Sequence, residues 1–157
     1  MNKRQDERTK GKAITKAQQT KADSLINKVF DIFRSEGWSD TSTVAALSRA
    51  LFAGMQAGMG IPKAQASEIF KQLMKAQMSA GIPVEVSNDW HKILGAFPEG
   101  TDTNVVMAVL TVALQAVMST KVGESKASEI IETLMLAQSR CWSEAAFQTN
   151  ESALAGF

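Results

Sequence analysis

Apolar residues recur along most of this chain at spacings of three and four positions, which is the period of an amphipathic α-helix. The first series covers about residues 24–36 and predicts one helix. The second follows the capping residues Ser39–Thr41 and ends at Gly58. The third opens at Pro62, whose fixed φ suits a first helical turn, and stops at Gly81. The first half of the chain is therefore predicted to contain three helices.

The second half repeats this order of elements. Val84–Val86 is too short and isolated to predict a sheet, so we interpret it as an extended linker. A short helix is predicted over residues 87–94, with Ser87 as its cap. Thr101 or Asp102 then caps a strongly apolar helix that runs through Met118. A last helix follows Gly123 and carries the residues Ile130, Ile131, Leu134, Met135 and Leu136.

The two halves also share identical residues at nearly constant offsets. Residues 66–77 share eight of twelve positions with residues 127–138 at an offset of 61. Residues 45–55 match residues 108–118 at six positions at an offset of 63, and these matches are Ala, Leu and Met. The difference of two residues falls in the turn between helices, where a change of length is tolerated. We therefore predict an internal duplication.

The N-terminal segment is strongly basic. Residues 1–22 carry two acidic residues and seven cations, so their net charge is +5, whereas residues 23–157 carry −4. With few large apolar residues, the segment buries too little surface to offset the entropy of ordering, and a disordered arm is predicted. It is either a phosphate-binding tail or a solubilising terminus. The cations are Lys3, Arg4, Arg8, Lys10, Lys12, Lys16 and Lys21.

These patterns together predict an all-α fold. We expect a tandem duplication of a three-helix unit, with about six helices packed as one compact helical domain behind the disordered basic arm. The arm covers residues 1–22, copy one residues 23–82 and copy two residues 83–142. The remaining residues 143–157 are predicted to form a C-terminal tail.

One helix carries a ridge of very small residues. Ala46, Ala50, Gly54 and Gly58 recur every four positions, so another helix can approach closely along this line. We expect the apolar helix of copy two to pack there, and a helix of copy one is the alternative. Large apolar residues near the ridge or at helix boundaries are further candidates for helix–helix or partner contacts, namely Met55, Met59, Trp38 and Trp90.

The residues that catalysis requires are sparse. His91 is the only histidine and Cys141 the only cysteine, so a triad or a zinc site has too few members. Gly54, Gly58 and Gly60 lie at a helix end without a following Gly-Lys-Ser/Thr, which disfavours a phosphate-binding loop. We therefore expect no catalytic residues, no metal, no cofactor and no small-molecule substrate, and we predict that the protein is not an enzyme.

Residues 59–72 have a sequence pattern similar to that of a helix-turn-helix motif, with a glycine turn before a second helix. Lys63 and Lys71 would then contact nucleic acid, together with Gln65 and Gln72. The long preceding helix disfavours this interpretation. An ordinary helical hairpin is the alternative.

The leading functional hypothesis is a non-catalytic protein-protein interaction module, an adaptor, regulator or inhibitor that acts through helix faces and forms a homo-oligomer. The alternative is a nucleic-acid-associated accessory protein that uses the basic arm. The longest strongly apolar stretch, residues 105–118, is too short for a bilayer, and no secretory signal is evident, so a cytoplasmic location without membrane contact is expected. Size, charge balance and helical class also resemble those of phage and plasmid accessory proteins.

Overall fold

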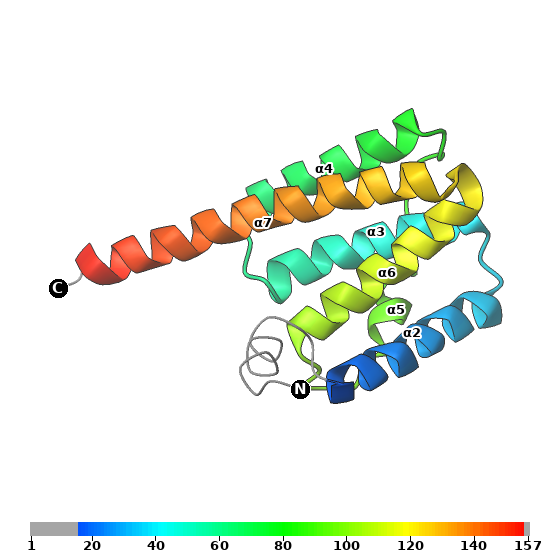
Figure 1. Cartoon of the computed structure of the whole chain (residues 1–157), viewed down its shortest axis with the longest axis horizontal. Coiled ribbons are helices and arrows are strands. Elements are labelled where there is room, and N and C mark those ends of the chain that lie inside the picture. The colour runs from blue at the N-terminus through cyan, green and yellow to red at the C-terminus, as the bar shows by residue number, and fades with distance from the viewer. Residues whose placement is uncertain (1–15, 156–157) are drawn as a thin grey trace, which may run out of the picture.

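The structure, a computed structural model, describes residues 16–155 of the 157-residue chain and places side chains up to Arg140, except that of Gln18. Six α-helices and no strand occur in these residues, which confirms the predicted all-α class. The helices are α2 (Lys16–Glu36), α3 (Asp40–Ala57), α4 (Lys63–Ser79), α5 (His91–Leu94), α6 (Thr103–Val122) and α7 (Glu124–Ala155) (Figure 1).

Local sequence signals determine several helix ends. The Ser39 hydroxyl accepts a hydrogen bond from the Ser42 backbone N–H at 3.2 Å and caps α3. The Asp102 carboxylate accepts one from the Asn104 N–H at 2.8 Å and caps α6. Gly123 separates α6 from α7 with a φ of +92°, a conformation that residues with side chains rarely adopt. These three boundaries are those that the sequence predicts.

The helices form three layers of two (Figure 1). The central layer consists of α3 and α6, which run in opposite directions and pack on each other. One outer layer contains α4, packed on α3, and α7, packed on α6, and these two helices also contact each other. The other outer layer contains α2 and the short α5. Both central helices are thus covered on two sides.

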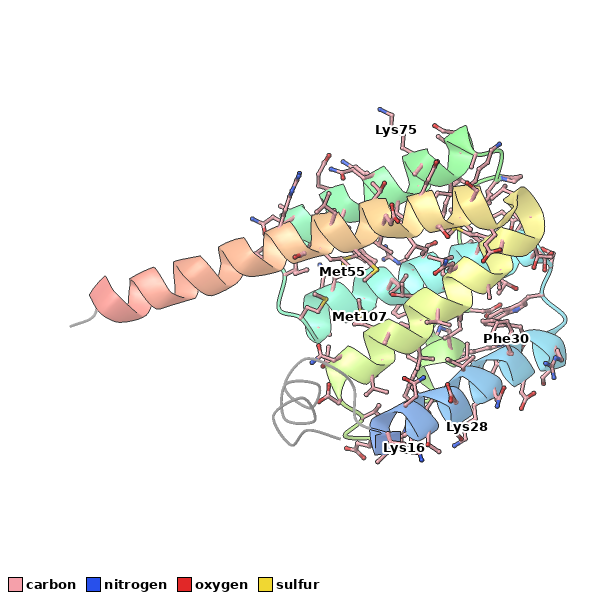
Figure 2. The ribbon with its side chains drawn as sticks, in the orientation of Figure 1. Lys16, Lys28, Phe30, Met55, Lys75 and Met107 are labelled. Carbon is pink, nitrogen blue, oxygen red and sulfur yellow. The ribbon has the colours of Figure 1, made fainter. Side chains whose placement is uncertain are left out.

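The small-residue ridge brings α3 and α6 together. Ala46 and Ala50 are fully buried on α3. A Cβ atom built on Gly54 would lie 2.6 Å from the Met107 Sδ, and one on Gly58 would lie 2.5 Å from the Thr103 Cγ2. Figure 2 shows Met107 on α6. The ridge therefore faces the apolar helix of the second half, as expected.

The outer layer of α2 and α5 connects the two halves crosswise. The first helix of the first half, α2, packs on α6, and α5 of the second half packs on α3. Exchanging α2 with α5, α3 with α6 and α4 with α7 leaves the set of contacting pairs unchanged. Two copies around a pseudo-twofold axis would produce this set. The duplication itself stays a prediction, because α2 has 21 residues and α5 only four.

Two buried glutamines occupy matching sequence positions but differ in their hydrogen bonds. The Gln77 side-chain N–H donates to the Ser48 Oγ at 2.9 Å, and the Met118 sulfur lies 3.8 Å away. The Gln138 Nε2 is buried and has no hydrogen-bond partner in the described part of the chain. Thr111 stands where Ser48 has its sequence match, but its hydroxyl donates to the Met107 carbonyl at 2.7 Å. The second glutamine therefore lacks the hydroxyl partner of the first.

The ends of the helical region differ from prediction. The first helix begins at Lys16 rather than near residue 24, and Ala22 is buried in the core, so the predicted arm boundary at residue 22 is wrong. Residues 1–15 of the arm lie outside the described residues. The last helix continues to Ala155, through most of the segment predicted as a tail, and extends past the N-terminal end of α4 (Figure 1).

The lengths of two internal helices also differ from the lengths predicted from the sequence. The helix expected over residues 87–94 is shorter, since α5 covers only His91–Leu94. The apolar helix α6 is longer than the 14-residue stretch and, by length and composition alone, is a candidate for a membrane span. In this fold α6 contacts α2, α3 and α7, and Leu110, Ala113 and Leu114 are fully buried. Such burial is typical of the core helix of a globular domain.

Replacing Gly54 by Leu should destabilise the protein, because its side chain would enter the space of Met107. Overpacking of this kind costs about 1 to 3 kcal/mol. The gain in helix propensity from Gly to Leu is smaller, roughly 0.8 kcal/mol. Ala57→Leu, at an exposed position of α3, is the matched control. Thermal unfolding should show a lower midpoint for Gly54→Leu only, and an unchanged midpoint would contradict the close packing of α3 on α6.

The two buried glutamines should respond differently to replacement by leucine. Gln77→Leu removes a satisfied hydrogen bond and should cost about 1 to 2 kcal/mol of the free energy of unfolding. Gln138→Leu removes a buried donor that has no partner, and it should be neutral or stabilising. Urea denaturation of both variants tests this difference. Equal losses of stability would show that Gln138 is satisfied in solution.

Candidate functional site

The structure does not bring the described nucleic-acid candidates together. Lys16 and Lys21 are exposed on α2, and Lys63 and Lys71 are exposed on α4. These helices belong to the two outer layers, on opposite sides of α3 and α6 (Figure 1). Figure 2 shows the same separation between Lys16 on α2 and Lys75 on α4. The remaining candidates, Lys3, Arg4, Arg8, Lys10 and Lys12, lie outside the described residues.

The segment that suggested a helix-turn-helix motif belongs to a helical hairpin. Helices α3 and α4 lie side by side and run in opposite directions (Figure 1). Lys63, Lys71 and Gln72 are exposed on α4. Gln65, however, is half-buried, and its Oε1 atom is inaccessible to solvent. The four predicted groove-facing residues therefore do not share one exposed surface.

Most of the ridge residues serve the interior of the protein. Ala46, Ala50 and Met55 are buried, so they make helix contacts within the chain and offer no surface to a partner. Gly54 and Gly58 lie against α6. The three half-buried candidates are Met59, Trp38 and Trp90. Of these, only Trp90 lines the groove described next.

The segment between α4 and α5 crosses the surface without regular secondary structure. Residues 83–88 make no backbone hydrogen bonds to other described residues. The Glu85 carboxylate accepts a hydrogen bond from the Ser42 hydroxyl at 2.9 Å, which holds the segment to the first turn of α3. Val84 and Val86 are exposed, the latter to 89%. Two apolar side chains thus face solvent, in a segment whose backbone groups have no backbone partner among the described residues.

This segment borders a groove of about 480 Å³, which we call the Arg49 groove. Its floor comes from α3 and α4, and its rim comes from residues 84–88 and from Trp90, the residue before α5. Because the floor is aromatic and aliphatic, the groove suits apolar side chains. Its lining residues are Ala45, Arg49, Phe70, Met74, Val84, Glu85, Val86, Ser87, Asn88 and Trp90.

Arg49 is the only cation in this groove, and aromatic rings surround it. Its Cζ atom lies 4.7 Å from the ring centre of Phe52, 5.9 Å from that of Phe70 and 6.0 Å from that of Trp90. Such cation–π contacts hold the guanidinium in place without using its N–H donors. Arg49 forms no ion pair or hydrogen bond with another described side chain. Its donors are therefore available to a ligand.

A second hollow of about 450 Å³ lies between α2, α3 and α6. Phe30, Phe33 and Trp38 contribute its aromatic surface. Its cation, Arg34, already pairs with Asp31 at 3.2 Å. Among the described side chains, this hollow therefore lacks the unpaired cation that distinguishes the Arg49 groove.

The charged groups beside α5 stabilise the fold. The Lys92 Nζ donates a hydrogen bond to the Glu36 carboxylate at 3.0 Å and lies 3.7 Å from Asp89. The hydrogen bond to Glu36 is the main reason that the pKa of Lys92 is raised. This pair ties α5 to the end of α2. No group of three His, Cys, Asp or Glu side chains in the described residues is arranged to bind a metal.

Sequence reasoning identified Trp90 but missed the other important residues of the groove. Arg49 is visible in the sequence only as a charge that interrupts an apolar helix. The alternation Val84-Glu85-Val86 was the one available signal, since in an extended chain the two valines share a face opposite the glutamate.

Comparison of the chain with protein-family models, with curated proteins and with solved structures finds no match in any of the three.

Proposed function

We propose that the protein is a non-catalytic protein-binding module and that a partner protein binds in the Arg49 groove. The observation that carries this proposal is the unpaired Arg49 guanidinium beside the exposed Val84 and Val86. Arginine, tryptophan and methionine are enriched at protein interfaces, and the groove contains Arg49, Trp90 and Met74. A cytoplasmic location is part of the same proposal.

The fold supports this proposal through the packing of the groove floor. The floor residues Arg49 and Phe70 belong to α3 and α4, which pack on each other and on the rest of the bundle. The ends of the rim are anchored by Ile82 and Ile93, which are both buried. A surface that is already ordered loses little entropy when a partner binds.

Val86→Asp should abolish partner binding, because it puts a charge on the most exposed apolar side chain of the rim. The matched control is Val112→Asp, which makes the same change at an exposed valine of α6 outside the groove. Tagged wild-type protein and both variants should be purified from source cells and their co-purifying proteins compared by mass spectrometry. A partner lost only with Val86→Asp supports the groove, and a partner retained by both variants contradicts it.

The same purification tests whether the partner is a second copy. Sedimentation of the purified wild-type protein gives its oligomeric state. A homo-oligomer that Val86→Asp converts to a monomer would make another copy of the chain the occupant of the groove. A homo-oligomer that survives this change must use another surface.

The second candidate function is nucleic-acid association through the basic arm. It is favoured by the exposed Lys16 and Lys21, which continue the cation-rich sequence of residues 1–15 onto α2. Because these lysines lie on a packed helix, the arm can be removed up to residue 15 without cutting into the described fold.

If the arm binds phosphates, deletion of residues 2–15 with Lys16→Gln and Lys21→Gln should abolish a gel shift with duplex DNA. The intact protein should lose affinity steeply with salt, with a slope of about −6 on logarithmic axes for seven cations. Assays at two salt concentrations, on DNA and on RNA, measure this slope. No shift by the intact protein at low salt would remove this function, and a shift retained after truncation would assign it to the helical body.

A further inference from the structure

We propose that the ligand of the Arg49 groove is an extended peptide segment of a partner protein, in which an Asp or Glu side chain binds Arg49. This inference rests on the proposed protein-binding function and adds the chemistry of the partner. It follows from the charge, the backbone and the side-chain pattern of the groove.

The charge of the groove favours a carboxylate. The rings of Phe52, Phe70 and Trp90 surround the guanidinium, and its edge N–H groups have no acceptor among the described side chains. A planar guanidinium matches a carboxylate through two parallel hydrogen bonds. A partly buried cation without a counter-charge is unfavourable, so an incoming carboxylate gains more here than at an open surface.

The acidic residue that lines the groove, Glu85, is not the counter-charge of Arg49. Glu85 also lines the groove, but its carboxylate accepts the hydrogen bond from Ser42 and forms no ion pair with Arg49. One cation beside one occupied carboxylate suits a singly charged ligand group. The negative charge of Glu85 repels a phosphate dianion about twice as strongly as a singly charged carboxylate, and phosphate sites usually combine several donors or cations.

The rim favours an extended peptide. Residues 83–88 belong to no helix and make no backbone–backbone hydrogen bond to another described residue, as at an unpaired sheet edge. Val84 and Val86 are exposed, and the Glu85 carboxylate accepts the hydrogen bond from Ser42 of α3. A peptide that pairs with such an edge gains main-chain hydrogen bonds, and its alternate side chains enter pockets on one side. About five or six residues, at roughly 3.3 Å each, are enough to follow this segment.

These features define a sequence pattern for the partner. In an extended peptide the side chains at positions i and i+2 lie on the same side. An acidic residue at Arg49 therefore places the residue two positions away over the apolar floor near Phe70 and Met74. We expect an Asp or Glu separated by one residue from an aliphatic or aromatic residue.

A phage-displayed library of random linear peptides, panned on the full-length protein, tests this pattern directly. Enriched peptides should carry the acidic and apolar residues at that spacing. A synthetic peptide of the enriched sequence should bind about tenfold or more tightly than its version with the acid replaced by the amide. This comparison uses the wild-type protein alone, so it does not depend on whether any variant folds.

Protein variants then test whether the carboxylate of the peptide binds Arg49. Arg49→Gln should weaken the acidic peptide by a similar factor and leave the affinity for the amide peptide unchanged, which identifies the two groups as partners. Lys121→Gln, at an exposed lysine of α6 outside the groove, should change neither affinity. Equal loss of both peptides with Arg49→Gln, while circular dichroism shows an intact fold, would contradict a direct contact.

The outcomes separate this inference from the proposed function. Enriched peptides that lack an acidic residue but lose affinity with Val86→Asp would overturn the carboxylate and leave the groove as the binding site. Failure of the library to yield any peptide would overturn the extended-peptide ligand, and the co-purification with Val86→Asp would still decide whether the groove binds a protein. Peptides unaffected by Val86→Asp would place binding elsewhere and overturn both.

Discussion

The close approach of α3 and α6 determines where every other helix can pack. Four small residues on α3 remove side-chain volume from the contact, so the two helices meet along the line from Ala46 to Gly58. The large apolar residues of α3, among them Leu47 and Leu51, are then fully buried on its remaining faces. Because interiors are packed at high density, bulkier residues along this line would move α6 and with it the outer helices. The three-layer arrangement therefore depends on a contact in which glycines of α3 leave room for the side chains of Thr103 and Met107 on α6.

The Arg49 groove is a consequence of how α5 is attached to this centre. Helix α5 packs on α3, so the chain must cross from the end of α4 over the surface of α3 to reach it. Ile82 and Ile93 fix the two ends of the crossing in the core. Residues 83–88 between them belong to no helix and make no backbone–backbone hydrogen bond to another described residue. This connection leaves an open edge beside Arg49, and it explains why the groove lies there.

Local signals in the sequence predicted the all-α class and several helix ends, but they did not predict the groove. Ser39 and Asp102 form their predicted caps because a cap depends on only a few neighbouring residues. The extension of α2 back to Lys16 was missed, because α2 packs on α6, which lies far away in the sequence. The environment of Arg49 could not be predicted from neighbouring residues either. Its surroundings combine residues of three separate segments, and no local pattern specifies that combination.

The crosswise packing of α2 on α6 has a consequence for the synthesis of the chain. Val122, the last residue of α6, is added 86 residues after Glu36, the last residue of α2. At translation rates of about 5–20 residues per second, this interval lasts about 4 to 17 s. During this time the face of α2 that carries Leu25, Val29 and Phe33 has no α6 to cover it. During its synthesis the nascent chain therefore exposes an apolar helix face that chaperones or neighbouring nascent chains can contact.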